Sequence, residues 1–379
     1  MNEIDCEKPE KEYPNISKIK FTLSVSPIAT VQKFLRNDNI LKLFQLYSDL
    51  IYDINFTCRI APFHTDAHGV FVDSDLNQAH LEDMLFLQDE LKIKVSPVFN
   101  NVYVPPTEEN LKLFVENLKP LYERGIRSIT QPHSLWMRYG LLQKQFPDLE
   151  IKNTVLRRLK SAQDFWNFAE LGFDYVNIDR VLMRDLKSLK EIKRAQKTFQ
   201  EKHGKYVALS MLTHEGCLGN CRFWEEHYQH TLTHPGINSS EECDAVFNRV
   251  KLMNDCSSVP LYALNKVFLP PFRADLEEIA QYFDVVKVAG RKTPHAIYEH
   301  LTVWFPLLNG NGPFALPPNV LIRKCFSDGA EQIKDLLNNW RKIIKNCRFQ
   351  CWDCRACEEL QEQVGLTDLI EDDLVEMRL

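Results

Sequence analysis

The chain has 379 residues, a formal net charge of -6 at pH 7 and a pI near 6.0. This balance argues against a protein that coats nucleic acid through a global basic field, although RNA stays open as a substrate. The apolar fraction of 44% and the charged fraction of 26% are those of an ordinary folded protein rather than a disordered chain.

The sequence carries no visible targeting or membrane signal. Residues 1–15 are polar and acidic and lack the charged-then-apolar pattern of a signal peptide. No run of about 18 apolar residues occurs, so no membrane span is expected. The 11 cysteines gather in clusters rather than in the spread framework of a secreted disulfide scaffold. We therefore expect a protein of the reducing cytoplasm.

Short β-branched or aromatic runs alternate with longer amphipathic runs, a pattern typical of repeated strand-helix units. The predicted strands are 21–26, 54–60, 94–100, 126–131, 150–155, 174–178, 206–212 and 284–288. The predicted helices are 107–124, with Gly125 as its C-cap, 135–146, 161–172, with Ser161 and Asp164 marking its start, 186–204 and 328–344. Eight strands with intervening helices predict a TIM-like (β/α)8 barrel over 19–312, between a polar leader, 1–18, and a C-terminal extension, 313–379.

The extension carries a dense group of thiols. Four cysteines lie within eleven residues: Cys347, Cys351, Cys354 and Cys357. A second pair, Cys217 and Cys221, follows the predicted strand 206–212. Thiolates separated by two or three residues can converge on one metal centre. The spacing alone leaves three interpretations open, namely iron-sulfur cluster, zinc site and inert cysteines.

Polar residues beside the cysteine pair suggest chemistry, because catalytic groups of such barrels gather where strands end. Gly216 would let the backbone turn sharply around a bound centre, and Asn220 could donate to a cluster sulfide. His214 and Glu215 could move protons.

Three arginines, Arg180, Arg184 and Arg291, are candidates for binding a carboxylate or phosphate. Their alternative role is an ion pair with an acid nearby, such as Asp179 or Asp185.

Three stretches resemble the collagenase-like peptidase family, peptidase U-32. Residues 171–192 are similar to the family's "lGvdrvVLaRELsl-eI" stretch, with Arg184 and Asp185 at its Arg-Glu pair. Residues 285–294 are similar to its "lKIeGRmKsp" stretch, which aligns Lys287, Gly290 and Arg291. Residues 209–221 lie where the family has a strand entering its cluster cysteines. The resemblance covers roughly residues 50–300 and implies an iron-sulfur barrel.

The resemblance implies a [4Fe-4S] cluster, but the ligand set departs from the family pattern. Typical members space their first two cluster cysteines further apart than Cys217 and Cys221, and Cys243 and Cys256 do not match the usual later pair. We expect Cys217 and Cys221 to share the cluster with two thiols of the extension. The extension ligands would be Cys351 and Cys354 first, with Cys347 and Cys357 as alternates or as ligands of a second centre. A self-contained zinc knuckle in the extension is the alternative.

The implied activity is oxygen-independent hydroxylation, or a related modification, of an RNA base or a small aromatic metabolite. A non-catalytic iron-sulfur partner within a protein complex is an alternative hypothesis. Proteolysis would follow from the family label, yet no Ser, His and Asp grouping or zinc-protease motif is visible. The spacing of Cys347, Cys351 and Cys354 copies that of radical S-adenosylmethionine enzymes, but it lies past the barrel instead of after the first strand.

Overall fold

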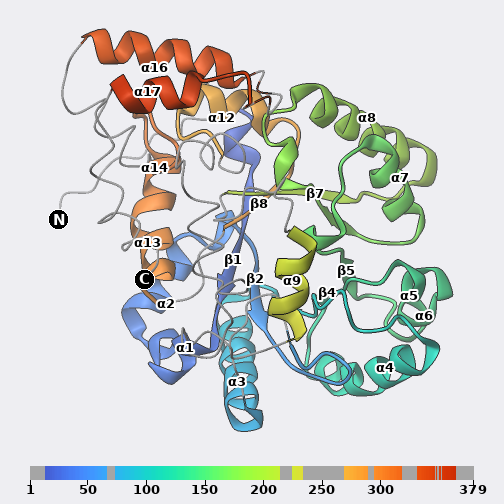
Figure 1. Cartoon of the computed structure of the whole chain (residues 1–379). Coiled ribbons are helices and arrows are strands. Elements are labelled where there is room, and N and C mark those ends of the chain that lie inside the picture. Colours follow the sequence, from blue (N-terminus) through green and yellow to red (C-terminus); the bar gives the residue numbers. More distant parts are fainter. Residues whose placement is uncertain are drawn as a thin grey trace.

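The computed structural model describes residues 13–65, 73–213, 224–233, 269–288, 294–317, 331–345, 347, 350 and 352–363. Eight parallel strands close into a barrel in chain order, as predicted (Figure 1). The strands are β1 Lys20–Val25, β2 Ile51–Thr57, β3 Val95–Val98, β4 Ser128–Thr130, β5 Glu150–Lys152, β6 Tyr175–Asn177, β7 Ala208–Leu212 and β8 Val285–Lys287. The ring is closed by β1 and β8, where Lys20 pairs with Val285.

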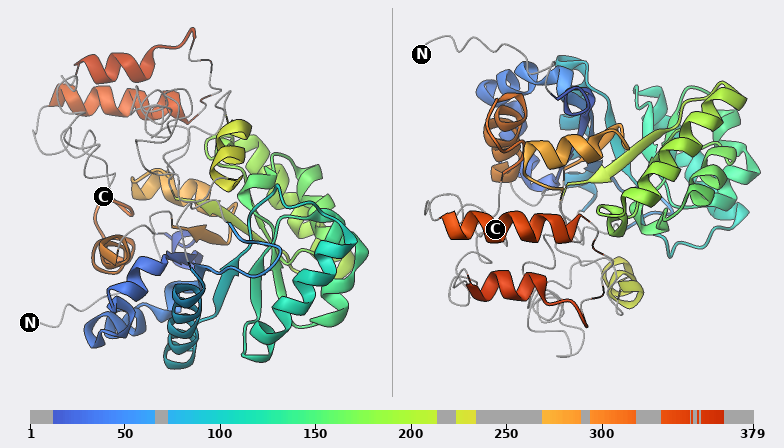
Figure 2. Two further views of the ribbon diagram at one scale, coloured as in Figure 1. Left: turned by 60° about the horizontal axis from the view of Figure 1, so that its bottom comes forward. Right: turned by 90° about the horizontal axis from the view of Figure 1, so that it is seen from above.

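Helices surround the barrel (Figure 2). The longer ones are α2 Asp38–Leu46, α3 Ser74–Leu91, α4 Glu108–Glu123, α7 Ala162–Glu170, α8 Leu186–His203, α9 Trp224–Thr233, α12 Arg273–Ala280, α16 Glu331–Ile344 and α17 Ala356–Gln363. The shorter ones are α1 Pro27–Val31, α5 Ser134–Tyr139, α6 Leu141–Gln145, α13 Pro294–Glu299 and α14 Phe305–Asn309, with a π-helical turn, His300–Trp304, between the last two. None of these described helices is both long enough and apolar enough to cross a bilayer.

Local sequence explains where several helices begin and end. The predicted cap Ser161 accepts a hydrogen bond from the Asp164 N–H and starts α7. Thr107 and Asp185 cap α4 and α8 in the same way. Gly204 ends α8 in the left-handed conformation, with φ of 67°, which glycine adopts at low cost.

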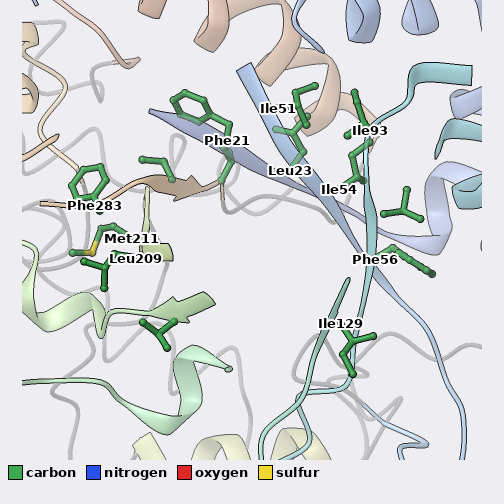
Figure 3. Packing of buried hydrophobic residues seen from close by; sticks show 14 of the residues in the cluster. Phe21, Leu23, Ile51, Ile54, Phe56, Ile93, Ile129, Leu209, Met211 and Phe283 are labelled. Carbon is green, nitrogen blue, oxygen red and sulfur yellow. The ribbon is translucent and has the colours of Figure 1, made fainter. Parts of the chain in front are cut away.

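The main core lies between the strands and the helices. Phe21 of β1 meets Phe305 of α14 with ring centroids 5.4 Å apart, and Phe56 of β2 meets His80 of α3 at 5.7 Å. Figure 3 shows further apolar side chains of this cluster, among them Ile54 and Leu209. Because side chains alternate along a strand, the residues between these apolar positions face the inside of the barrel.

Two acids anchor the strands at the amino end of the barrel. Asp174, just before β6, accepts a 2.8 Å hydrogen bond from the N–H of Ile151 in β5. Asp284, just before β8, accepts a 2.9 Å bond from the N–H of Leu209 in β7. Lys205 pairs with Asp174 at 2.7 Å. The two acids therefore join neighbouring strands at the end opposite to the one where barrel chemistry is expected.

Two of the differences from the predicted boundaries have a local cause. The helix predicted over 135–146 is two helices, because Gly140 between them adopts a φ of 76° and interrupts the hydrogen-bonded turns. The second strand begins at Ile51 instead of residue 54, and it includes a buried acid, Asp53. Asp is uncommon in strands, which is why the apolar run alone placed this strand three residues too late.

Candidate functional site at the carboxyl end of the barrel

The carboxyl ends of the strands carry a ring of buried polar residues. Asn100 and Asn101 follow β3, Gln131 follows β4, and Asn153 follows β5, all less than a tenth exposed. Asn177 in β6 donates through its Nδ2 to the Asn153 carbonyl oxygen at 2.6 Å. These bonds fix the loops that surround the mouth of the barrel, where ligands of this fold bind.

Helix α9 lies across this end of the barrel. Trp224 at its start is buried beside Leu156 of the loop after β5, and the Arg158 guanidinium lies 4.7 Å from the centre of the indole ring. Near the helix end, the Leu232 carbonyl accepts hydrogen bonds from Thr65 at 2.5 Å and Asn101 at 3.3 Å. The helix is therefore held by the loops that follow β2, β3 and β5.

The segment 214–223, which carries the cysteine pair, lies outside the described residues, but both of its described neighbours are at the mouth. On one side, Thr213 follows β7, and its N–H donates to the Lys287 carbonyl of β8 at 2.9 Å. On the other side, Trp224 begins α9. The described residues that flank the segment thus both lie at the carboxyl end of the barrel.

Arg180 and Arg184 lie in the loop between β6 and α8 and are 1% and 8% exposed. Asp179, proposed as a partner for such an arginine, instead pairs with Arg158 at 2.8 Å and accepts a bond from the Val181 N–H. Asp185 caps α8 through the Ser188 N–H at 3.0 Å. The two neighbouring acids therefore have structural partners of their own.

The electrostatic neighbours of Arg184 include a residue of the extension. Burial lowers the pKa of Arg184 to about 10, and the negative charge of Asp275 opposes that shift, with Cys347 also within electrostatic range. Cys347 therefore lies close enough to act on an arginine that follows β6. The predicted sharing of a cluster between the extension and the barrel mouth stays a prediction.

The extension reaches Arg184 because α16 docks beside α12, as both views in Figure 2 show. Arg341 pairs with Asp275 at 2.7 Å and places its guanidinium 3.9 Å from the centre of the Phe272 ring. Lys345 pairs with Glu278 at 2.7 Å. A separate apolar cluster completes the contact: Phe272, Leu337, Trp340, Ile344 and Leu360.

The remaining predicted site residues divide into two groups. Cys354 is exposed, whereas Cys357 is half-buried and packs against the α16 cluster. Eight predicted residues lie outside the described part of the chain: His214, Glu215, Gly216, Cys217, Asn220, Cys221, Arg291 and Cys351. Among the residues that are described, no group of three or more His, Cys, Asp or Glu side chains could hold a metal ion.

Sequence reasoning missed a charged network inside the barrel. Lys152 of β5 pairs with Asp53 of β2, and the Thr22 hydroxyl of β1 donates to Asp53 at 2.6 Å. Complete burial, together with the charge of Lys287, holds the pKa of Lys152 well below its usual range. The one available signal was a charged residue at an inward position of a predicted strand, Lys152 within 150–155.

A cavity of about 700 Å³ opens at the opposite, amino end of the barrel, lined in part by Tyr52, Glu150 and Asp284. Its acids already have partners, since Glu150 accepts bonds from Tyr52 at 2.6 Å and Lys94 at 2.8 Å. Residues at the amino end of such barrels usually contribute to stability rather than to catalysis. The mouth, not this cavity, is the candidate site.

The chain is a (β/α)8 barrel protein. No family model matches the sequence, and no curated protein is similar to it at a significant level. Among solved structures it is similar to the U32 peptidase Mk0906, with 11% identity over 73% of this chain and 94% of that one and a TM-score of 0.46. It is also similar to the spore cortex-lytic enzyme SleL of Bacillus cereus, with 9% identity over 70% and 75% of the two chains and a TM-score of 0.34. At these TM-scores the similarities add nothing about function.

Proposed function

We propose that this protein is an iron-sulfur enzyme whose [4Fe-4S] cluster is shared between the barrel mouth and the C-terminal extension. The observation that supports this most is the position of Cys347, which lies within electrostatic range of Arg184 in the loop after β6. The described residues on either side of the segment with Cys217 and Cys221, Thr213 and Trp224, lie at the same end of the barrel. The proposal brings thiols from two distant parts of the sequence to this end.

The residues fit the chemistry of such a cluster. Cys217, Cys221, Cys351 and Cys354 would supply four thiolates, with Cys347 and Cys357 as alternates, and thiolates are the ligands that iron-sulfur clusters prefer. A cluster with four thiolates is anionic, and a buried arginine such as Arg184 offers a compensating charge. When bound, the cluster would supply electrons or polarise a bound substrate.

The side chains of the mouth would serve binding and proton transfer. Arg180, Arg184 and Arg291 would hold acidic groups of the substrate, and His214 or Glu215 would move a proton. The substrate would be an RNA base or a small aromatic metabolite, and the reaction oxygen-independent hydroxylation or a related modification, as the resemblance to the collagenase-like peptidase family implies. The buried amides around the mouth, such as Asn177, would orient its polar edges.

The test is anaerobic purification followed by iron and sulfide assay and by ultraviolet-visible and paramagnetic resonance spectra. We expect about four irons per chain, the content of one [4Fe-4S] cluster. Single Ala variants at Cys217, Cys221, Cys351 and Cys354 should lose this iron. Cys58→Ala is the matched control, because burial raises the pKa of the Cys58 thiol to about 12 and keeps it protonated.

Two results would contradict the proposal. One is a colourless protein that carries stoichiometric zinc under anaerobic conditions, which would favour the zinc knuckle. The other is full iron content in the variants of Cys217 and Cys221, which would remove the barrel from the ligand set. A bound cluster without turnover of any RNA or quinone-like substrate would instead favour the non-catalytic partner.

A further inference from the structure

The inside of this barrel is polar, whereas such barrels are usually filled by branched apolar side chains. The ion pair of Lys152 and Asp53 joins β5 to β2, which are not neighbours in the ring, so it crosses the interior. The two side chains are 2% and 0% exposed. A buried ion pair costs more desolvation than apolar side chains of similar volume, and charged groups of this kind gather at functional sites.

The surroundings of Lys152 are those of a reactive amine. Its Nζ lies beside the Asp53 carboxylate, 3.6 Å from Glu150 Oε1 and 5.0 Å from the centre of the Tyr175 ring. Burial and the second cation, Lys287, both favour the neutral amine. Desolvation beside another positive charge is one way in which proteins turn a lysine into a nucleophile.

A bulge in β2 creates this arrangement. Phe21 of β1 pairs with Ile51, but the next residue, Thr22, pairs with Asp53, so Tyr52 is an extra residue. As a result two consecutive side chains reach the interior: Tyr52 packs against Tyr175, and Asp53 meets Lys152. Bulges often aim side chains next to active sites.

Polar atoms without a protein partner lie toward the mouth. Ser26 Oγ after β1, Asn55 Oδ1 in β2 and Asn153 Nδ2 after β5 are buried and have no hydrogen bond to any residue that the structure describes. Asn55 is on the same face of β2 as Asp53, two residues closer to the mouth. Buried polar atoms of this kind ordinarily meet water or a ligand, so these atoms suit a small molecule that carries hydroxyl groups.

We propose that Lys152 is a nucleophile that forms an imine with a small hydroxylated aldehyde or ketone inside the barrel. The Asp53 carboxylate first takes a proton from the Lys152 ammonium group. The neutral amine nitrogen then adds to the carbonyl carbon, and one of its protons passes to the carbonyl oxygen, which gives a carbinolamine. The C–O bond then breaks, and a proton from the Asp53 carboxyl group leaves with the hydroxyl group as water. One carbonyl compound, one amine and one proton thus become one protonated imine and one water. No thiol takes part, so the inference is independent of the proposed cluster.

The test is reductive trapping in the full-length protein. Protein at pH 7 is incubated with DL-glyceraldehyde or pyruvate and sodium cyanoborohydride, and peptides are analysed by mass spectrometry. We expect Lys152 to be alkylated at least about 10-fold faster than Lys112, a surface lysine of the same chain that is 61% exposed. Lys152→Arg abolishes the label at that position while keeping a positive charge. Asp53→Asn slows labelling of Lys152 by about 10-fold and leaves Lys112 unchanged.

The comparison of labelling rates between Lys152 and Lys112 in the wild-type chain tests the proposal even where a variant fails to fold. Labelling of Lys112 without labelling of Lys152 by either probe, in protein with native circular dichroism, would show that Lys152 and Asp53 form a structural ion pair only. Labelling of Lys152 at the rate of Lys112 would equally overturn the proposal, because it would show no activation of the amine.

Discussion

His80 shows how a single buried side chain ties the amino-terminal part of the barrel together. It lies on α3, its Nδ1 is 2.7 Å from the Thr30 hydroxyl of α1, and its ring meets Phe56 of β2. Burial lowers the pKa of His80 to about 4, so the folded protein keeps the imidazole neutral at ordinary pH. An imidazole of the unfolded chain takes up a proton near pH 6.5.

This difference makes the protein sensitive to acid. Below pH 6.5 the unfolded state binds one proton more than the folded state, so the free energy of unfolding falls as the pH drops toward 4. We expect His80 to contribute a loss of about 2 kcal/mol between pH 7.5 and pH 5. Urea unfolding at the two pH values measures it, and His80→Asn should show that much less acid sensitivity. An identical pH dependence in both proteins would refute the role of His80.

At the scale of single residues, roles that depend on neighbours in the sequence could be predicted. Ion pairs between residues far apart in the sequence could not. Ser161 was predicted as a cap because capping depends on neighbours in sequence, and the structure confirms it. Asp53 was not recognised as a strand residue, because its partner Lys152 lies on another strand, about a hundred residues away. No local rule brings such a pair together.

Among the elements, α16 depends on charge as well as on apolar contact for its position. Asp275 of α12 accepts from Arg341 at 2.7 Å and lies 3.4 Å from Lys345, and its charge also acts on Arg184. One carboxylate therefore faces three cations that come from the extension and from the loop after β6. Its side chain is only 12% exposed, so solvent screens it weakly.

Asp275→Asn tests this contact. The change leaves three cations without their shared anion and should weaken docking of α16 by about 1–2 kcal/mol. Hydrogen exchange of the α16 amides measures it, and we expect faster exchange there with unchanged exchange in α4. Glu362→Gln is the control, because it breaks an exposed pair with Arg355 that contributes little. Unchanged protection of α16 in Asp275→Asn would mean that the apolar cluster alone holds the extension.

Strands and helices were predictable because alternation and 3.6-residue periodicity are local properties. All eight predicted strands are present, and α8 ends at Gly204 as expected. Interruptions of helices were harder to predict. Gly140 has open space around it, and its positive φ divides the helix predicted over 135–146 into two. The short helices between 294 and 309 have no capping or periodic pattern that marks them in advance.

At the scale of the molecule, the extension and the barrel have separate apolar clusters. Leu337, Trp340 and Leu360 belong to the small cluster, whereas Phe165 and Phe199 belong to the main core. The side of the barrel on which the extension docks follows from long-range contacts that sequence periodicity does not encode. The predicted convergence of thiols therefore stays a prediction, and of the six thiols named for it the described residues include Cys347, Cys354 and Cys357.

Because the two apolar clusters are separate, we expect a substitution in one of them to leave the stability of the other unchanged. Trp340→Ala removes a side chain that is 4% exposed from the small cluster, so α16 should undock while the barrel keeps its unfolding midpoint. Phe165→Ala, in the main core, should lower the free energy of unfolding by about 3–5 kcal/mol. Far-ultraviolet circular dichroism during thermal unfolding distinguishes the two, and iron assay of the same samples links docking to the proposed cluster. If Trp340→Ala lowers the midpoint as much as Phe165→Ala, barrel and extension unfold as one unit. Should it keep both its midpoint and its iron while α16 exchanges freely, thiols of the extension are not ligands.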